Sequence, residues 1–494
     1  MLHLWGYDLS LDDLKAFRQL DSKTPGHPES THTAGIEVTT GPLGQGVANA
    51  VGFSMASQHA SYLLNSDEAK FINHKVYCFC GDGDLEEGIS YEACSMAGHN
   101  KCDNLVLIYD SNNITIEGNT DISISENIEM RFTSQGWDVI EIDGHDFTQI
   151  TNAFDQAQTQ TKPLLIIAKT KIGRGAATME GSHHTHGAPL GVDELKASKE
   201  KAGCSTESFV IEADVKARFE AAVEKGDLFE REWNKLVISA PLKEQNTMLE
   251  RLQNPDLGSI EYPTFNVGDM AATRDTNHKI LNAIAKALPN FIGGSADLAP
   301  SNKTNLDSFE DFPKGKNIHF GIREHSMAAI TTAIAQYGLF MPFCATFFIF
   351  SDYLKPSARV AALMRAQLFY VFTHDSIGVG EDGGTHQPVE QLGTFRAIPD
   401  SYTFRPADGV ENVEAWINAL ALQAPSAFVL SRQKLPILNR DNMIGDMAKG
   451  AYLLSPSENA KITLLATGSE VALALDTKAL LEEAGIKTNV VSAP

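Results

Sequence analysis

The sequence contains no apolar run near the ~20 residues that a membrane-spanning helix requires. Its start, Met1–Trp5, also lacks the basic and apolar segments of a secretory signal, so we expect a cytoplasmic protein. Positive charge is scarce: 40 Lys and Arg face 63 Asp and Glu, giving a net charge of −23. An acidic surface repels nucleic acids and anionic membranes, so we expect neither as a partner.

Cysteine is also scarce, with six residues in 494 and no C-x-x-C pair. Cys78 and Cys80 alternate along an expected strand, so both should face the same side of it. We therefore interpret the cysteines as buried, reduced thiols rather than as disulfide partners or metal ligands. A reducing compartment fits this interpretation.

Short β-branched runs alternate with amphipathic stretches through most of the chain, whose 43% of apolar residues can fill several cores. In the first half we expect strands at 75–80, 104–109, 137–142 and 164–168, and helices near 88–99, 123–135 and 146–158. Residues 193–253 are charged and helical in pattern, with no strand. Apolar strands separated by helices predict an α/β fold in which parallel sheets carry helices on both faces.

The alternation starts again after this charged stretch. Further helices are expected at 274–287, 324–337, 347–365, 410–421 and 470–484, and strands at 290–293, 339–346, 368–373, 427–430, 461–467 and 488–492. We predict three consecutive domains, at 1–253, 254–440 and 441–494. The third contains a single β-α-β unit, which cannot cover both faces of its own sheet, so we expect it to be truncated.

The sharpest local motif is G-D-G-D-L-E-E-G at 81–88, which follows an expected strand and opens a helix. Thirty positions after Asp82, Asn112 follows the next strand. Parallel strands end at the same sheet edge, where a carboxylate, an amide oxygen and a backbone carbonyl together suit Mg²⁺ or Ca²⁺. Gly, Asp and Asn are also ordinary turn residues. The combination at this spacing favours a metal and diphosphate site.

This motif and its spacing resemble the thiamine-diphosphate signature. Further segments, in family order and over the whole chain, narrow the resemblance to transketolases: T-P-G-H-P (24–28), T-T-G-P-L-G-Q-G (39–46), H-G-A-P-L (186–190), G-G-S-A-D-L-A-P-S (293–301), G-I-R-E-H (321–325), T-H-D-S-I-G-V-G-E-D-G-G-T-H-Q-P (373–388) and L-S-R-Q (430–433). Gly384 stands where the family usually has proline. The family also has several dozen residues before the position of Met1, so we expect the first domain to be truncated as well.

The resemblance implies bound thiamine diphosphate with Mg²⁺, for which Ca²⁺ or Mn²⁺ could substitute. The implied metal ligands are Asp82, Asn112 and the Ile114 carbonyl. Other implied cofactor contacts are Gly81, Gly83, Gly41, Leu43 and His186. An aromatic set, Phe347, Phe350 and Tyr353, has the i, i+3, i+6 spacing of one helix face. Such a stripe is usually core, but here it resembles the family segment that stacks on the pyrimidine ring.

Among implied catalytic groups, Glu324 matches the glutamate that hydrogen-bonds the aminopyrimidine ring. A glutamate at a helix start can instead simply offset the helix dipole. Glu87 resembles a glutamate that links two active sites across a dimer. The histidines could cap loops, but the resemblance places His27 and His374 near the donor's hydroxyl and carbonyl groups, and His186 near the diphosphate.

The resemblance also assigns groups to the sugar phosphate. Arg274, Ser301 and Arg432 match its phosphate ligands, with His386 nearby and Asp382 reading hydroxyl configuration. Singly, each arginine would be an ordinary solvated charge.

The implied activity is transfer of a two-carbon ketol unit between a ketose phosphate and an aldose phosphate, in the pentose phosphate pathway, by a homodimer. Alternatives are a related ketol-transferring enzyme, such as a dihydroxyacetone synthase or a deoxyxylulose-phosphate synthase, and a non-catalytic fragment.

Overall fold

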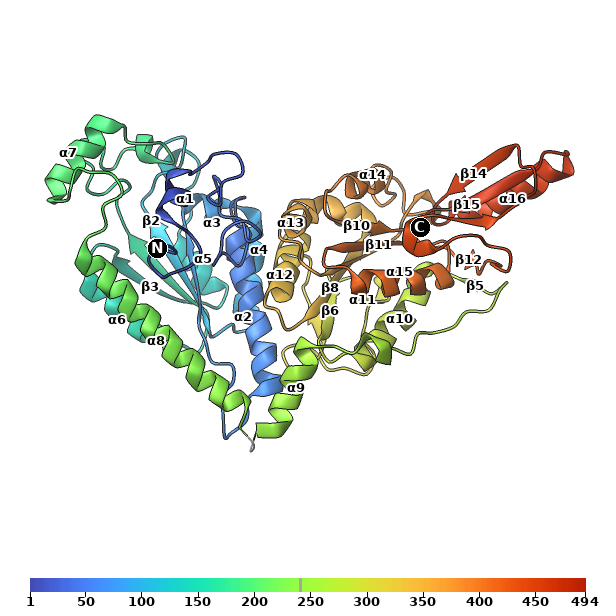
Figure 1. The fold of residues 1–494 in the computed structure, drawn as a ribbon, viewed down its shortest axis with the longest axis horizontal. Helices are drawn as coiled ribbons and strands as arrows, with labels where there is room; N and C mark the ends of the chain where they lie inside the picture. Colours follow the sequence, from blue (N-terminus) through green and yellow to red (C-terminus); the bar gives the residue numbers. More distant parts are fainter. Residues whose placement is uncertain (240–241) are drawn as a thin grey trace. The chain divides into compact units, whose positions relative to one another are not determined.

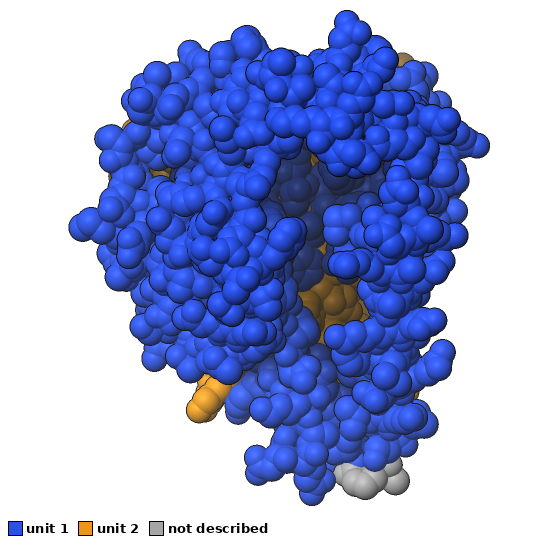
Figure 2. All heavy atoms as spheres, turned by 90° about the vertical axis from the view of Figure 1, so that its left-hand side faces the viewer, with its two compact units in different colours: residues 1–246 blue, residues 247–494 orange. Residues whose placement is uncertain are grey.

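The computed structural model describes residues 1–239 and 242–494. The chain divides into two compact units, residues 1–246 and residues 247–494, which Figure 2 distinguishes by colour. Within the described residues, no helix is both long enough and apolar enough to cross a bilayer.

The first unit is built on a sheet of four parallel strands in the order β1-β2-β4-β3. The strands are β1 (Val76–Cys80), β2 (Leu105–Ser111), β3 (Asp138–Asp143) and β4 (Leu164–Lys169). The central strands β2 and β4 are almost entirely buried and apolar. That is the pattern of strands covered on both faces. All four strands lie where the sequence predicted them, within about two residues at each end.

Helices lie on both faces of this sheet. The helices of this unit are α1 (Leu11–Lys15), α2 (Gln45–Leu64), α3 (Asp82–Glu86), α4 (Gly88–His99), α5 (Ile128–Ser134), α6 (Phe147–Ala157), α7 (Val192–Ala202) and α8 (Ala213–Val237). Helix α2 packs on β1 and β2, and α6 packs on the opposite face against β3 (Figure 1). The boundary between the units lies inside α9 (Lys243–Gln253). The helical, strand-free nature predicted for 193–253 is confirmed for the described residues.

The second unit contains a sheet of six parallel strands in the order β10-β11-β9-β8-β6-β7. The strands are β6 (Phe291–Ser295), β7 (Asn317–His319), β8 (Met341–Phe347), β9 (Phe369–Thr373), β10 (Tyr402–Phe404) and β11 (Ser426–Leu430). An aromatic core fills one face: Trp416 stacks on Phe428 at 4.1 Å between ring centroids, and Phe291 stacks on Phe343 at 5.3 Å. The three phenylalanines belong to strands β6, β8 and β11, and Trp416 belongs to the helix that covers them, so strands and helix share one core.

Two helix layers enclose this sheet. The helices are α10 (Thr273–Ala287), α11 (Ala299–Asn302), α12 (Glu324–Gln336), α13 (Ser351–Leu363), α14 (Gln391–Arg396) and α15 (Gly409–Ala421). Helices α10 and α15 cover the aromatic face, while α12 packs against β8 and α13 on the other (Figure 1). A short antiparallel pair, β5 (Met270–Ala271) and β12 (Leu435–Pro436), lies beside them.

The last segment forms a small sheet of its own. Strand β15 (Thr488–Ser492) pairs in parallel with β14 (Ile462–Ala466) and in antiparallel fashion with β13 (Tyr452–Ser455), and α16 (Glu470–Glu483) packs on both parallel strands. Tyr452, Leu454 and Val471 share an apolar cluster with Ala407 and Leu438. The predicted β-α-β unit is confirmed, and its sheet gains β13, which the sequence did not reveal.

Other sequence predictions need correction. The helix predicted at 347–365 is wrong at its start, because Phe347 ends strand β8 and Phe348–Phe350 form a 3₁₀ turn before α13. The small-residue helix α2 and the short strands β5, β7, β10, β12 and β13 were not predicted. Both α2 and these strands carry weak periodic patterns, which explains the omission.

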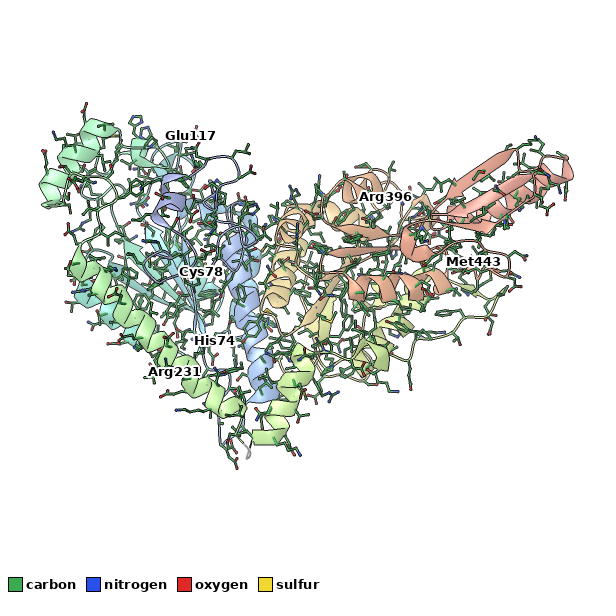
Figure 3. The ribbon with its side chains drawn as sticks, in the orientation of Figure 1. His74, Cys78, Glu117, Arg231, Arg396 and Met443 are labelled. Atoms are coloured by element: carbon green, nitrogen blue, oxygen red, sulfur yellow. The ribbon has the colours of Figure 1, made fainter. Side chains whose placement is uncertain are left out.

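The cysteines only partly match the prediction of buried thiols. Four of them (Cys80, Cys94, Cys102 and Cys344) are buried, and all six are free. Burial raises the pKa of the Cys102 thiol to about 12, so it stays protonated and unreactive at neutral pH. Cys204 is exposed, which contradicts the prediction for that residue, and Cys78 (Figure 3) is half-buried.

Candidate functional site

The predicted metal site lies at the carboxyl edge of the first sheet. Asp82 opens α3 directly after β1, and Asn112 follows β2. Because β1 and β2 pair in parallel with Cys80 opposite Tyr109, both loops leave the same edge. The expectation that Asp82 and the Asn112 turn come together is therefore confirmed.

Asp82 is 8% exposed, and only one of its two carboxylate oxygens accepts a hydrogen bond from the described residues. Its Oδ1 accepts a hydrogen bond of 2.5 Å from the Tyr109 hydroxyl, whereas Oδ2 is buried and accepts none from the described residues. Burial raises the pKa of Asp82, while Tyr109 and the nearby backbone amides of Asn112 and Asn113 lower it. A buried oxygen without a donor is unfavourable unless a cation compensates it.

Asp82 and Tyr109 line a cavity of about 410 Å³ together with Ser111, Asn113 and Lys169. The Asn112 side chain closes its own turn, because its Oδ1 accepts from the Ile114 amide at 3.0 Å. Within the described residues, no three His, Cys, Asp or Glu side chains gather as a metal cluster. A cation here would therefore depend on Asp82, amide and carbonyl oxygens, and a ligand's own oxygens.

Glycines and a neighbouring aspartate shape this edge. Asp84 accepts from the amides of both Gly44 and Gly81, at 2.9 Å each, and so ties the loop before α2 to the loop before α3. A Cβ at Gly83 would lie 3.0 Å from Leu43. Asp84 lies within the motif at 81–88, but no role was predicted for it. Its position three residues after Gly81, as in a capping box, was the available signal.

The remaining predicted residues of the first unit lie on loops. His27 is exposed, and its Cβ lies 3.5 Å from the point that a Cβ at Gly41 would occupy, so these two positions adjoin. Glu87 is the exposed N-cap of α4. His186 is exposed after a 3₁₀ turn, and among the described residues no hydrogen bond or ring contact joins it to Asp82 or His27.

At the second sheet, Glu324 opens α12 and is half-buried. Its Oε1 accepts a hydrogen bond from the Thr346 hydroxyl at 3.3 Å. Burial raises the pKa of Glu324, opposed in part by that hydrogen bond. A raised pKa favours the protonated form of the carboxyl group, which can share its proton with a ligand nitrogen.

Beside Thr346, an aromatic group gathers at the ends of β8 and β9. Phe347 stacks on Phe350 at 5.8 Å and lies 3.8 Å from the His374 ring, while His386 meets Phe350 edge-on at 5.4 Å. Tyr353 is 65% exposed, and its ring centroid lies 6.2 Å from that of Phe350. The three aromatic residues predicted to share one helix face in fact come from a strand, a 3₁₀ turn and a helix.

His374 is the centre of a cationic group. Burial, together with the charges of Arg274 and Arg432, lowers its pKa to about 4, and the charge of Asp382 opposes them. Arg274 donates to the Ser301 carbonyl at 2.9 Å and Arg432 to the Val379 carbonyl at 3.0 Å. The structure thus brings together the residues predicted to bind the sugar phosphate within this unit. Two neighbouring guanidinium groups favour an anion between them.

Three comparisons place this chain among known proteins. Residues 1–255 match the family model "Transketolase, thiamine diphosphate binding domain", residues 269–437 match "Transketolase, pyrimidine binding domain", and residues 450–494 match "Transketolase-like TK C-terminal domain". Curated transketolases of Halalkalibacterium halodurans and Bacillus subtilis are 46% and 45% identical. All of this chain aligns with 76% and 77% of theirs.

Solved structures with a similar fold are also transketolases. The transketolase of Campylobacter jejuni superposes with a TM-score of 0.96 at 61% identity, covering all of this chain and 77% of that one. A Pichia stipitis transketolase, solved as a complex with sedoheptulose 7-phosphate, gives a TM-score of 0.96 at 41% identity, over all of this chain and 76% of that one.

Proposed function

The chain belongs to the transketolase family, and from that premise we propose which of its residues perform the ketol transfer. It is a transferase with a thiamine-diphosphate-binding domain, acting on ketose and aldose phosphates. When bound, thiamine diphosphate supplies the carbon nucleophile that accepts the two-carbon unit. The three-domain division at 1–253, 254–440 and 441–494 remains our proposal, supported by the ranges of the matching models.

Asp82, the Asn112 side chain and the Ile114 carbonyl would hold Mg²⁺ on the diphosphate. The unpartnered Oδ2 of Asp82 supports this assignment, because a divalent cation would satisfy it. Gly81 and Gly83 leave the backbone open beside it, and Gly41 and Leu43 come from the adjoining loop. Asp84 would keep these two loops in place.

The proposed catalytic role rests mainly on Glu324. Its half-buried carboxyl, with the pKa raised by burial, lies at the helix start beside Thr346. It would share a proton with the aminopyrimidine ring. Phe347 and Phe350 offer the apolar faces that a planar ring needs, with the exposed Tyr353 at the outer margin.

The sugar phosphate would bind to Arg274, Arg432 and Ser301. The rings of His374 and His386 contact Phe347 and Phe350, and the sugar would lie beside this aromatic pair. The negative charge of Asp382 raises the pKa of His374, against the effect of burial. A neutral His374, favoured by its lowered pKa, can accept a hydrogen bond from a sugar hydroxyl. His27 and His186 would complete the donor and diphosphate contacts.

A homodimer is part of the proposal. The first unit carries the predicted metal ligands and the second carries Glu324 and the aromatic pair, and in the family the site forms between two chains. The exposed Glu87 would lie at that interface. A cytoplasmic location remains a prediction from the sequence.

Calorimetry tests the proposal directly. Titration of the protein with thiamine diphosphate in the presence of Mg²⁺ should show saturable binding, which EDTA abolishes and Asp82→Asn weakens. Ketol transfer between a ketose phosphate and an aldose phosphate should follow the same saturation, and sedimentation should report a dimer. Absence of cofactor binding would contradict the site assignment, whereas binding without turnover would contradict only the catalytic roles.

A further inference from the structure

Arg405, just beyond β10, makes a buried ion pair next to the cationic group. Its Nε and Nη2 donate to Oδ2 of Asp375 at 3.0 and 2.7 Å. The two side chains are 6% and 1% exposed. Asp375 directly follows His374, so this pair holds the main chain of the residue that we place at the sugar.

The same guanidinium group reaches the segment that contains α16. Nη1 donates to the Thr467 carbonyl at 3.1 Å, Nη2 donates to the Ser469 hydroxyl at 3.0 Å, and Glu470 forms a second ion pair. Gly468 lies so close that a Cβ there would meet the Arg405 side chain at 2.7 Å. Arg405 therefore joins the loop after β9 to the start of α16.

His374 needs such support because its backbone is strained. Its φ of 64° lies in the left-handed region, which costs a non-glycine residue about 1 kcal/mol or more. On one side the Thr373 hydroxyl lies 2.8 Å from its Nδ1 and donates to Asn302 Oδ1 at 2.7 Å. On the other side Asp375 is held by Arg405. A strained conformation persists only where its surroundings determine it from both sides.

We propose that Arg405 is a positioning residue, which fixes His374 at the sugar site through Asp375 and couples that site to the start of α16. This role rests on the proposed function of His374. Replacing the planar guanidinium by an amine would keep the positive charge but lose the paired hydrogen bonds. Asp375 would then be a poorly compensated buried charge, and its loop would move to solvate it.

A second pair provides a matched control. Arg440 donates to both carboxylate oxygens of Asp408, at 2.8 and 2.9 Å, and to the Tyr452 hydroxyl in β13 at 3.1 Å. It is likewise an arginine–aspartate pair with two hydrogen bonds that reaches the last segment, with side chains 14% and 0% exposed. Among the described residues, no hydrogen bond or ion pair joins Arg440 to His374. Arg396 (Figure 3) is a further control, because it donates to the Thr467 hydroxyl at 3.4 Å and, within the described chain, makes no hydrogen bond to Asp375.

The experiment compares Arg405→Lys, Arg440→Lys and Arg396→Lys in the full chain with thiamine diphosphate and Mg²⁺. We expect Arg405→Lys to lower kcat/KM for phosphorylated ketose about tenfold or more, because misplacing a contact by an ångström has effects of that size. Cofactor affinity should be unchanged. Arg440→Lys should lower thermal stability similarly and leave kcat/KM within about twofold. Arg396→Lys should leave both thermal stability and kcat/KM close to the wild-type values.

A double-mutant cycle separates positioning from general stability. If Arg405 acts through His374, Arg405→Lys should have little further effect on kcat/KM in a His374→Asn background. Independent, additive losses would overturn the proposal, as would an equal loss in Arg440→Lys. If Arg405→Lys fails to fold, Glu470→Gln removes only the ion pair between Arg405 and the start of α16, and it tests the same coupling with a smaller change.

A measurement without catalysis distinguishes failure of this proposal from failure of the proposed function. Nuclear magnetic resonance titration of the His374 ring should show its pKa rising from about 4 towards the ordinary 6.5 in Arg405→Lys, because the ring leaves its buried place. The pKa should not change in Arg440→Lys. An unchanged His374 pKa in Arg405→Lys would overturn the positioning role even if the wild-type chain proved inactive.

Discussion

The carboxyl edges of the two parallel sheets differ in charge and in construction. The first edge carries a buried carboxylate, Asp82, with an unpartnered oxygen, and glycines that leave its backbone open. The second carries arginines and histidines against aromatic rings, with Glu324 beside them. In our proposal, the same sheet geometry would serve a cation at one edge and an anion with a planar ring at the other. What distinguishes them is the set of side chains at the strand ends.

The construction differs as well. In the first unit the proposed metal ligands come from only two short segments, Asp82 beside its glycines at 81–83 and the turn at 112–114 after the next strand. In the second, His374, Arg274 and Arg432 come from the ends of β9, α10 and β11. A local site is held by its own turn, and a dispersed one depends on packing and on ties such as Arg405–Asp375. Substitutions at the two edges should therefore have different consequences.

The largest effect is expected at Glu324. Glu324→Gln keeps the shape but cannot ionise, so ketol transfer should fall by at least about a hundredfold, as for loss of a general acid–base group. Folding and Mg²⁺ affinity should remain near normal, because the proposed metal ligands belong to the first sheet. Steady-state kinetics measure the ketol transfer, and calorimetry measures folding and Mg²⁺ affinity. Glu414→Gln, an exposed glutamate on α15, is the control; near-normal turnover in Glu324→Gln would refute the assignment.

Asp82→Asn should separate stability from ligand binding. Without metal the variant should be at least as stable as wild type, because it removes a buried charge with an unpartnered oxygen. At ligand concentrations about a hundredfold above the dissociation constant, wild type should gain about 2.7 kcal/mol and the variant far less. Thermal melts with and without thiamine diphosphate and Mg²⁺ measure this.

The control for that comparison is Asp103→Asn, an exposed aspartate at the other end of β2. Equal ligand-induced stabilisation of Asp82→Asn and wild type would show that Asp82 does not bind the metal.

At the cationic edge, Arg274→Ala and Arg432→Ala should raise the KM for phosphorylated sugars roughly ten- to hundredfold, the effect of losing a charged hydrogen bond of about 1.5–3 kcal/mol. Unphosphorylated sugars should be little affected. Parallel kinetics with both substrate types measure the difference, with the exposed Arg359→Ala as control. Equal losses on both types would make these arginines structural.

The smallest effect concerns pH. The pKa of His374 is about 4 in the folded protein and about 6.5 when unfolded, so the unfolded chain binds the proton first as pH falls. Folded-state stability should therefore drop by about 1 kcal/mol between pH 6.5 and 5.5 through this group. His374→Asn, which tolerates the positive φ, should lose that part of the pH dependence.

Thermal melts of wild type and His374→Asn across this pH range measure the difference. The exposed His319→Asn is the control. Identical pH dependence in wild type and His374→Asn would show that the His374 ring is not held in its neutral form.

Much of the fold could be predicted because strong periodic patterns mark it. Strands such as β2 and β9 are continuous apolar runs, and helices such as α10 alternate polar and apolar faces, so their positions were predicted within a few residues. Helix α2 was missed because its faces are alike in polarity, and β10 because it is short. The aromatic segment was misjudged because three phenylalanines and a tyrosine suit a strand as well as a helix.

The sequence by itself determined the alternation of strands and helices and the local motif at Asp82, because each is encoded in neighbouring residues. The motifs also identified Glu324, His374 and the two arginines as candidates, although not their arrangement. Only the tertiary structure decided that the Asp82 Oδ2 lacks a donor, that Phe347 ends a strand against His374, and that Arg405 holds Asp375 and α16 together. These contacts join residues up to 65 positions apart, as in Arg405 and Glu470. Such pairs leave no periodic pattern in the sequence, because the burial of each residue and the distance to its partner are set only when the sheets and helices pack together.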